Sequence, residues 1–331
     1  MSRTLQFTIG IAITALFVWL IVRHVDLASV GVALGQAHPG WIIGGVAIFF
    51  TGYSARVYRW RIMLSDANGG ITWAGAFGPF MASMAANNVL PFRAGDVLRA
   101  FAFTKWLGQG APAVLATLLV ERLLDLLILL LALGLALTWF GMTSETAGQL
   151  VGMGAGGLMV LAFAVLAVLL FPGLLAPVVF WCISLLGKLS TALAAKIQGA
   201  AENVFATLKS QAHGPRMIVL IFWSLIAWTC EGLVFYCAAR AVPALTDATA
   251  ALLAFPVGTL STLIPSTPGY LGTFDFFVIQ SMQLLDNPAA AAAAFAVLVH
   301  LILWLPITIL GGLSLLYLQA KGAFQRPTAS T

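Results

Sequence analysis

Three charged residues at regular spacing interrupt an otherwise apolar stretch of this chain: Arg93, Asp96 and Arg99. A charged side chain among residues this apolar is costly to bury, so by default it indicates a functional site. The planar guanidinium of Arg93 suits recognition of a phosphate. If a helix begins near Gly95, its N-terminus also favours an anion, and Asp96 and Arg99 can pair one turn apart. The alternative is that the three charges only neutralise one another and hold a turn in place.

A second turn late in the chain carries hydroxyl groups in place of charges. Ser266 and Thr267 precede Pro268, which is a natural first residue of a helix. Their hydroxyls either bind a ligand or simply cap that helix. If both helix ends and Arg93 converge, they form an anion site. The predicted substrate-binding residues are Asn87, Asn88, Arg93, Asp96, Arg99, Ser266, Thr267 and Gly269.

Further charges lie inside apolar segments. Glu121 and Asp125 are one turn apart, and counting from Pro112 places them roughly 14 to 20 Å into a helix. At that depth we expect them to face the interior and pair with an arginine, Arg93 or Arg99, in a structural or a coupling role. A second set of predictions concerns intramembrane charge or coupling, at Glu121, Arg122, Asp125, Glu231 and Asp275. His300 is interpreted as a core histidine with satisfied hydrogen bonds.

No pattern in the sequence indicates catalysis. No nucleophile–base arrangement and no metal-ligand spacing stands out, and Cys182, Cys230 and Cys237 lie in apolar segments as small hydrophobic residues. We therefore expect no enzyme activity, no metal and no cofactor. The net charge of +5 comes from basic residues scattered at the ends of apolar runs, so we expect no nucleic acid partner.

The composition explains where these residues must lie. Hydrophobic residues make up 61% of the 331 residues and charged residues 8%, whereas a soluble domain carries about 25% charged residues. This predicts an all-α polytopic membrane protein, because only internally bonded helices satisfy the backbone in lipid. Six stretches are long enough to span a bilayer. They lie near 5–22, 40–62, 112–139, 150–171, 216–240 and 289–317.

Two other apolar regions, 73–106 and 247–285, are broken in the middle by proline and glycine. Pro91 and Gly95 in the first match the spacing of Pro265 and Gly269 in the second. We interpret each region as a re-entrant helical hairpin. With both termini cytoplasmic, twelve of the sixteen basic residues then lie inside, two lie outside and two lie at membrane depth. The hairpins enter from opposite sides, which makes an inverted repeat typical of transporters.

The predicted organisation is one transmembrane domain over 1–318, with repeat halves of about 1–145 and 146–318. A cytoplasmic interfacial helix is expected at about 188–211, with a solvated connector helix as the alternative. The apolar stretch 174–187 is either a connection or an extra membrane segment. Residues 319–331 are expected to form a short polar tail.

The motifs at these residues resemble the flippase-like, lysylphosphatidylglycerol-synthase-type transmembrane domain, which includes the YbhN-like proteins. The family's Leu-Pro-x-Arg-x-Gly-acid-x-x-Arg motif matches residues 90–99, and its acid-Arg-x-x-Asp cluster matches residues 121–125. Its Pro-x-x-Pro-Gly-x-x-Gly motif matches residues 265–272, and an Arg-x-x-Arg-Trp pattern falls at 56–60. The chain departs from the family at Asp96 and Asp275, where glutamate is more usual.

The resemblance implies a lipid flippase or transporter in a bacterial cytoplasmic membrane, with an anionic or phosphate-bearing lipid as its partner. We expect no soluble aminoacyl-transferase domain and therefore no lysyl transfer. Two alternatives remain. One is a non-transporting accessory protein that presents lipid to a lipid-modifying transferase, and the other is a small-anion carrier.

Overall fold

The computed structural model describes residues 3–64, 70–141, 148–171, 173, 176–187, 190–211 and 215–322. Every regular element in these ranges is a helix. The expected boundary between the repeat halves and most of the expected polar tail lie outside the described residues, as does the start of the expected interfacial helix. The fold class is therefore all-α, as the apolar composition predicts.

A helix lies at each of the six predicted spans. They are α1 (Arg3–His24), α3 (Pro39–Leu64), α7 (Ala111–Gly141), α8 (Gly148–Leu170), α11 (Pro215–Ala241) and α14 (Ala289–Ala320). Among the described residues, α7, α11 and α14 are long and apolar enough to cross a membrane by length and composition. A fourth span results if α1 is joined to α2 (Leu27–Gly35), from which it is bent by 82°. The chain is thus an integral membrane protein with three to four membrane-length apolar helices.

Both interrupted regions form pairs of short helices joined by a turn. The first consists of α4 (Trp73–Val89), the 3-10 turn η1 (Pro91–Arg93), α5 (Ala94–Phe101) and α6 (Thr104–Leu107). The second consists of η3 (Ala248–Ala250), α12 (Ala251–Ser261), η4 (Pro268–Tyr270) and α13 (Thr273–Gln283). In each region the two main helices pack against each other. We call α4–α5 hairpin 1 and α12–α13 hairpin 2.

The turns of the two hairpins correspond in a register that differs from the sequence prediction. Pro91 begins η1, but its counterpart at the start of η4 is Pro268 and not Pro265. The third residue of each turn is left-handed, Arg93 at φ 51° and Tyr270 at φ 58°. A proline fits the first position of such a turn because its φ is already fixed and its missing donor is not needed there. Pro91 and Arg93 thus correspond to Pro268 and Tyr270, although the second turn also has a left-handed residue at its centre, Gly269 at φ 75°.

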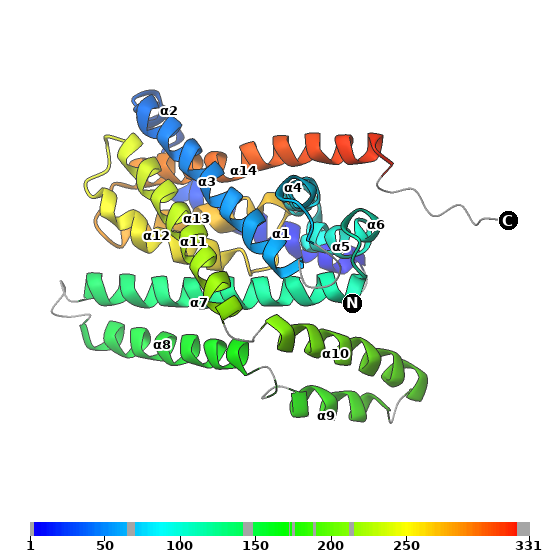
Figure 1. Cartoon of the computed structure of the whole chain (residues 1–331). Helices are drawn as coiled ribbons and strands as arrows, with labels where there is room; N and C mark the ends of the chain where they lie inside the picture. Colours follow the sequence, from blue (N-terminus) through cyan, green and yellow to red (C-terminus); the bar gives the residue numbers. More distant parts are fainter. Residues whose placement is uncertain are drawn as a thin grey trace.

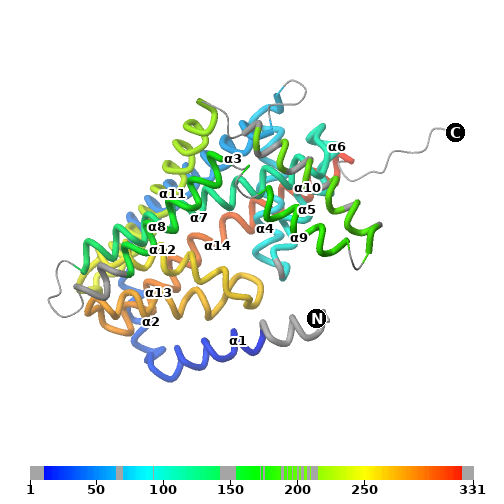
Figure 2. Tube along the Cα trace, turned by 90° about the horizontal axis from the view of Figure 1, so that it is seen from below, coloured from blue at the N-terminus to red at the C-terminus, as the bar shows by residue number. Residues whose placement is uncertain are grey.

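The helices form two unequal parts on either side of α7 (Figure 1). On one side α8 and α10 (Thr191–Gln211) pack against α7, and α9 (Ala176–Gly187) packs against α10. The other side holds both hairpins together with α1, α3, α11 and α14. Figure 2 shows α1 along the outer edge of this larger part, where it contacts α13.

The apolar stretch that was a possible extra membrane segment forms α9, which has 12 residues. At 1.5 Å per residue this helix is about 18 Å long, too short to cross a bilayer fully. In α10, Leu193 is exposed while Ala194 is buried against its neighbours. The described part of α10 is thus a helix with an outward apolar side chain, and its interfacial position remains a prediction.

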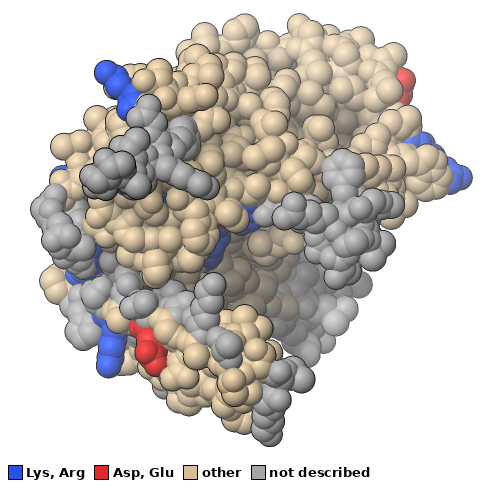
Figure 3. Space-filling model, turned by 90° about the vertical axis from the view of Figure 1, so that its right-hand side faces the viewer, with Lys and Arg blue, Asp and Glu red and all other residues tan. Residues whose placement is uncertain are grey.

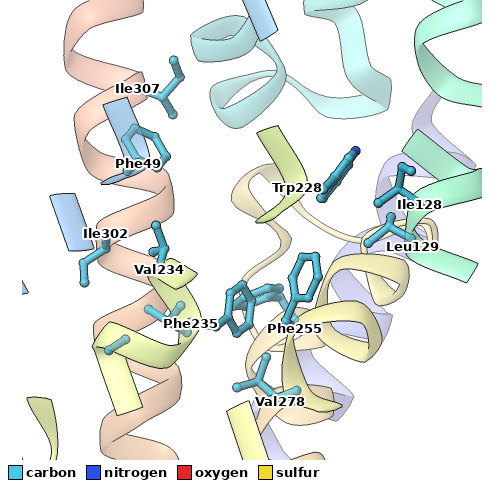
Figure 4. Packing of buried hydrophobic residues seen from close by; sticks show 14 of the residues in the cluster. Phe49, Ile128, Leu129, Trp228, Val234, Phe235, Phe255, Val278, Ile302 and Ile307 are labelled. Atoms are coloured by element: carbon cyan, nitrogen blue, oxygen red, sulfur yellow. The ribbon is translucent and has the colours of Figure 1, made fainter. Parts of the chain in front are cut away.

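The core extends over most of the helices, and its aromatic centre lies where α11, the two helices of hairpin 2 and α14 meet. The ring of Phe235 lies 5.6 Å from that of Phe255, 6.1 Å from that of Phe274 and 6.2 Å from that of Phe295. Figure 4 shows Phe235 and Phe255 beside Val278, with Trp228 facing Ile128 and Leu129 of α7. This aromatic packing holds hairpin 2 against two membrane-length helices.

The expected distribution of basic residues requires a correction. Arg56, Arg59 and Arg99 are among the twelve basic residues counted on the cytoplasmic side, but each pairs with a carboxylate inside the protein, so none of them marks a membrane surface. Arg59 is 1% exposed and Arg99 is 0% exposed. Nine of the twelve basic residues then remain to indicate the cytoplasmic side, against two outside. Figure 3 views the end of the molecule where α14 finishes, and lysine and arginine atoms lie around and within a central hollow there.

Candidate functional site

A cavity of about 500 Å³ lies between the tips of the two hairpins. Hairpin 1 contributes Asn87, Asn88 and Arg93 to its wall, and hairpin 2 contributes Gly269 and Tyr270. Long helices supply the remaining polar wall, at Tyr53, Arg56, Arg122, Asp125, Trp228, Glu231, His300 and Trp304. A second cavity of about 310 Å³ also has Arg93 and Gly269 in its wall and adds Ser266 and Thr267. The structure therefore brings six of the eight predicted substrate-binding residues to the two cavities.

The turn of hairpin 1 places Arg93 in the walls of both cavities. Its backbone is left-handed, a conformation that costs a non-glycine residue roughly 1 to 2 kcal/mol. Its guanidinium makes no hydrogen bond or ion pair with the residues that the structure describes. It therefore offers its donors to both cavities. Strained backbone of this kind is characteristic of binding sites, where the surrounding structure holds it in place.

Asp96, the next charge along, closes hairpin 1 and does not line either cavity. Asn87 Nδ2 donates to Asp96 Oδ1 at 2.9 Å, and the Asp96 backbone N–H donates to Asn87 Oδ1 at 3.1 Å. Arg122 of α7 donates to Asp96 Oδ2 at 3.0 Å. The carboxylate and the Asn87 side chain thus fasten the start of α5 to the end of α4 and to α7.

Arg99 and Glu121 form a buried ion pair below this clasp. Arg99 Nη2 donates to Glu121 Oε1 at 3.1 Å, and Nη1 donates to Oε2 at 3.2 Å. The guanidinium also lies over the rings of Trp60, at 5.1 Å, and Phe80, at 4.8 Å. The expected pairing of Glu121 with Arg99 is therefore present. Neither residue lines the cavities, so this pair fixes hairpin 1 to α7 rather than contacting a ligand.

Asp125 pairs with Arg59, which was expected only to mark the cytoplasmic side of a span. Arg59 Nη1 donates to Asp125 Oδ1 at 2.9 Å and to Ser224 Oγ at 2.8 Å. Trp228 Nε1 donates to the same Asp125 oxygen at 3.0 Å. The expected partner, Arg93 or Arg99, is therefore wrong for Asp125. The contacts join α3, α7 and α11.

Glu231 is not the isolated carboxylate that its surroundings in sequence indicate. Arg56 Nη2 donates to Glu231 Oε2. The Arg56 guanidinium also stacks over the ring of Trp228 at 4.3 Å. Both charged side chains line the larger cavity, so α3 and α11 contribute an ion pair to its wall.

Hairpin 2 is fastened by neutral groups and by one histidine. The hydroxyls of Thr267 and Thr14 lie 2.9 Å apart, and the Thr267 backbone N–H donates to Thr14 Oγ1 at 3.1 Å. His300 contacts Asp275 at 2.7 Å and the Gly269 carbonyl at 3.0 Å. His300 is thus satisfied, as expected for a core histidine, but its partners belong to the turn of hairpin 2.

The tips also contact each other through α14. Asn88 Nδ2 donates to Thr308 Oγ1 at 2.9 Å. Gly269 has φ 75°, and a Cβ there would lie 3.6 Å from the Asn88 carbonyl and 3.0 Å from Trp304 Nε1. Only glycine suits this position, because the backbone is left-handed and the space is tight.

The charges on the larger cavity do not balance. Arg56, Arg93 and Arg122 face Asp125 and Glu231, which leaves one positive charge in excess. Two neutral donors are also unsatisfied within the described residues: Trp304 Nε1 on the larger cavity and Ser266 Oγ on the smaller one. Buried donors without partners are rare in folded proteins. The arrangement can hold an anion with several acceptor oxygens, such as a phosphate.

The sequence did not reveal the interior roles of Arg56, Arg59 and Trp228, nor the partners of His300. One signal could have identified the arginines. Glu121, Asp125 and Glu231 place three carboxylates deep in apolar helices, and each needs a buried cation. Arg56 and Arg59 lie one turn apart in the motif that ends α3, so they are available on one face. No sequence signal points to His300, since its contacts depend on how hairpin 2 packs.

Comparisons with known proteins agree on a membrane family. The family model for the lysylphosphatidylglycerol synthase TM region matches residues 7–311. Glycosyltransferase AglD of Haloferax volcanii is 25% identical over 94% of this chain and 54% of its own length. A UPF0104 membrane protein of Methanocaldococcus jannaschii is 23% identical over 74% of this chain and 98% of its own length. The chain thus spans about half the length of the glycosyltransferase that it matches.

Proposed function

Because the chain belongs to the family of the lysylphosphatidylglycerol synthase TM region, we propose that it moves an anionic or phosphate-bearing lipid between membrane leaflets. The headgroup phosphate would bind between the hairpin tips, while the acyl chains stay in the bilayer. A cavity of about 500 Å³ suits a headgroup. It falls in the usual range for small-molecule sites, roughly 300 to 1,000 Å³.

The observation that carries this proposal is the set of unpaired donors around the tips. Ser266 Oγ from hairpin 2 and Trp304 Nε1 from α14 have no hydrogen-bond partner among the described residues, and Arg93 from hairpin 1 lines both cavities without a hydrogen bond to a described residue. All three can donate a hydrogen bond, and a phosphate oxygen only accepts. The guanidinium of Arg93 suits two phosphate oxygens at once. Arg122 lies on the same wall, where Asp96 already pairs with it, so Arg93 supplies the one positive charge in excess.

The proposed arrangement in the membrane is six spans with two re-entrant hairpins entering from opposite sides. Two features support it. The hairpins have a left-handed residue at corresponding positions of their turns, Arg93 and Tyr270. In addition, the part of α1 from Ile11 to His24 leads away from the end of the molecule where α14 finishes, as is expected if both termini are cytoplasmic (Figures 1 and 2). Access would alternate as one half, 1–145 or 146–318, rocks against the other.

Side-specific labelling tests this arrangement. Gly110, between α6 and α7, and Thr246, between α11 and α12, are exposed and lie on opposite sides in the proposal. In a Cys182→Ser background, which removes the exposed native thiol, Gly110→Cys should react only from the cytoplasmic side. Thr246→Cys should react only from the other side. Labelling of both from one side would contradict the inverted repeat.

A leaflet-transfer assay tests the function. The purified protein is reconstituted into vesicles that contain a fluorescent phosphatidylglycerol, and transfer is followed by chemical quenching of the outer leaflet. The wild type should accelerate transfer, and Arg93→Ala should reduce the rate at least tenfold. Arg93→Lys should keep part of the rate, because it retains the charge but loses the planar fork. Arg23→Ala is the matched control, since Arg23 is exposed and far from the tips in the chain. Equal rates for wild type and Arg93→Ala would reject the assigned role of Arg93.

A second candidate is a non-transporting accessory role beside a lipid-modifying transferase. It is favoured by the similarity to about half of a protein named a glycosyltransferase. In that case the protein should co-purify with a transferase, and vesicles containing it alone should show no acceleration of transfer. A small-anion carrier is distinguished in the same vesicles. Inorganic phosphate would then compete at millimolar concentration and be transported itself, whereas a lipid transporter would leave it outside.

A further inference from the structure

His300 of α14 contacts an oxygen through each of its two ring nitrogens. Nδ1 lies 2.7 Å from Asp275 Oδ1, and Nε2 lies 3.0 Å from the carbonyl oxygen of Gly269. The Phe274 ring meets the imidazole edge-on at 5.1 Å and fixes its orientation. The two side chains are mostly buried, with 13% of His300 and 16% of Asp275 exposed. Both contacts are short enough to be hydrogen bonds.

If both contacts of His300 are hydrogen bonds, the His300–Asp275 pair must carry one additional proton. A neutral imidazole has one N–H donor and one nitrogen that only accepts. The Gly269 carbonyl accepts only, and an ionised Asp275 accepts only. Both contacts can therefore be hydrogen bonds only if the ring carries two protons or if Asp275 carries one. In either form, the His300–Asp275 pair is electrically neutral and binds one proton more than a neutral histidine beside a carboxylate.

Loss of that proton would break a contact to the turn of hairpin 2. The neutral ring would have a single N–H to share between Asp275 and Gly269, and the remaining nitrogen would face an oxygen without a hydrogen between them. Asp275 is held in place, because its second oxygen accepts from the Gly272 backbone N–H at 2.9 Å. The Gly269 carbonyl is therefore the contact most easily given up. Gly269 itself lines both cavities.

We propose that His300 and Asp275 form an exchangeable proton-binding site that couples protonation to anion binding between the hairpin tips. This inference rests on the proposed function for its anion, but its proton chemistry can be measured separately. When the proton is bound, the pair is neutral, the turn of hairpin 2 is held, and the cavity keeps its one excess positive charge. When the proton leaves, the pair becomes negative and cancels that excess. By reciprocity, the anion raises the affinity for the proton by the same factor.

The other titratable groups near this site do not substitute for it. Asp275 is the only titratable side chain that α13 presents, and α2, α4 and α12 have none in their sequences. The last turn of α1, which packs against α13, carries Arg23 and His24; both are exposed, and they contact Trp19 and the Leu20 carbonyl of their own helix. From α3 and α11, Arg56 and Glu231 reach the same cavity but are already paired with each other. From α7, Arg122 and Asp125 reach it, and each has its own ion-pair partner. The remaining titratable groups on the wall are the phenols of Tyr53 and Tyr270 and the guanidinium of Arg93.

Histidine nitrogen NMR on the full chain tests the proton site without transport. The protein is labelled with ¹⁵N-histidine in lipid bilayers, and His300→Gln identifies the His300 signals. Spectra are recorded from about pH 5 to about pH 9, the interval in which an imidazole can change its charge. The wild type should show the proton-loaded pair at the acidic end and one bound proton fewer at the basic end. Asp275→Asn should keep His300 neutral over that interval, because the amide can donate to Nδ1 while its oxygen caps Gly272. A His300 signal in the wild type that stays neutral and unchanged over this range would overturn the proposal.

The coupling is tested by transfer of phosphatidylglycerol at equal pH on both sides of the vesicle. This phosphodiester keeps its single charge over the range, so any pH dependence comes from the protein. The wild-type rate should fall by up to about tenfold per pH unit above the pH at which this proton leaves, as one-proton linkage allows. Asp275→Asn should retain both contacts at every pH and make the profile flat. His300→Leu should be slow throughout.

The outcomes separate this inference from the proposed function. If the wild type releases the His300–Asp275 proton in the NMR experiment but transfers no lipid at any pH, the lipid transport is rejected and the proton site stands. A wild type that transfers lipid with the same pH profile as Asp275→Asn would reject the coupling and leave the transport in place.

Discussion

The two hairpins share a turn but are fastened by different chemistry. Hairpin 1 is clasped by Asn87 and Asp96 and joined to α7 through Arg122 and the buried pair of Arg99 with Glu121. Hairpin 2 contains a single charged residue, Asp275, and is tied to α1 and α14 by hydroxyls and a histidine. Strong charge-assisted bonds hold the first tip in one geometry, whereas the second tip depends on weaker contacts. We infer that hairpin 1 positions the anion and that hairpin 2 is the part able to release it.

The largest loss of stability should come from substituting the glycine at which the two helices of each hairpin pack closely. A Cβ at Gly95 would lie 1.9 Å from the Ser83 carbonyl oxygen, which is backbone and cannot yield. A Cβ at Gly258 would lie 2.5 Å from a methyl group of Val278, which can rotate. Gly95→Ala should therefore lower the free energy of unfolding by more than about 3 kcal/mol, and Gly258→Ala by about 1 to 3 kcal/mol. Denaturation in detergent micelles measures both, and equal losses would remove this difference between the hairpins.

The next effect concerns the buried ion pair that only hairpin 1 possesses. Arg99→Met removes both hydrogen bonds to the buried Glu121 carboxylate and leaves it only the 3.8 Å contact with Arg122, so it should cost about 3 to 5 kcal/mol of unfolding free energy. The double variant with Glu121→Leu should recover most of that loss, because it leaves no unpaired charge. A double-mutant cycle by the same denaturation measures the coupling. Additive losses would show that the two charges do not support each other.

A smaller effect should follow removal of a hydroxyl that fastens hairpin 2. Thr14→Val leaves the Thr267 backbone N–H without its acceptor and should cost about 1 to 2 kcal/mol. Thr51→Val is the matched control, since Thr51 bonds only to the Ala47 carbonyl of its own helix. The control should change stability by less than about 0.5 kcal/mol. Identical losses in the two variants would mean that the contact between α1 and hairpin 2 adds no stability.

The fold could be anticipated from the sequence wherever the pattern is local. Runs of about 20 apolar residues predicted the positions of the helices, and Pro91 and Pro268 lie in the two breaks that interrupt them. The predicted counterpart of Pro91 was Pro265, whereas the turns match Pro91 with Pro268, three residues further along the chain. Spacing alone does not reveal that Arg93 and Tyr270 are the left-handed residues, because that depends on how each chain reverses. The number of spans and the direction of the hairpins remain predictions.

The candidate site was only partly predictable for a related reason. A charge in an apolar stretch is visible in the sequence, so Arg93, Glu121 and Asp125 could be selected. Arg99 could be named as the partner of Glu121, but the partner of Asp125 could not, since an ion pair between α3 and α7 depends on how distant helices pack. Arg59 looked like a surface residue because it lies near the end of α3, yet it satisfies Asp125 in the interior. His300 gains its importance only from the turn that packs against it.

The central claim is that a lipid phosphate binds to Arg93 between the tips. Native mass spectrometry of the purified protein, titrated with phosphatidylglycerol and with diacylglycerol of the same acyl chains, tests it most directly. The wild type should bind phosphatidylglycerol about 10- to 100-fold more tightly than Arg93→Ala does, the effect of losing bonds to a charged group. Arg23→Ala should bind like the wild type, and diacylglycerol should not distinguish the three proteins. Equal affinity of wild type and Arg93→Ala for phosphatidylglycerol would contradict the account.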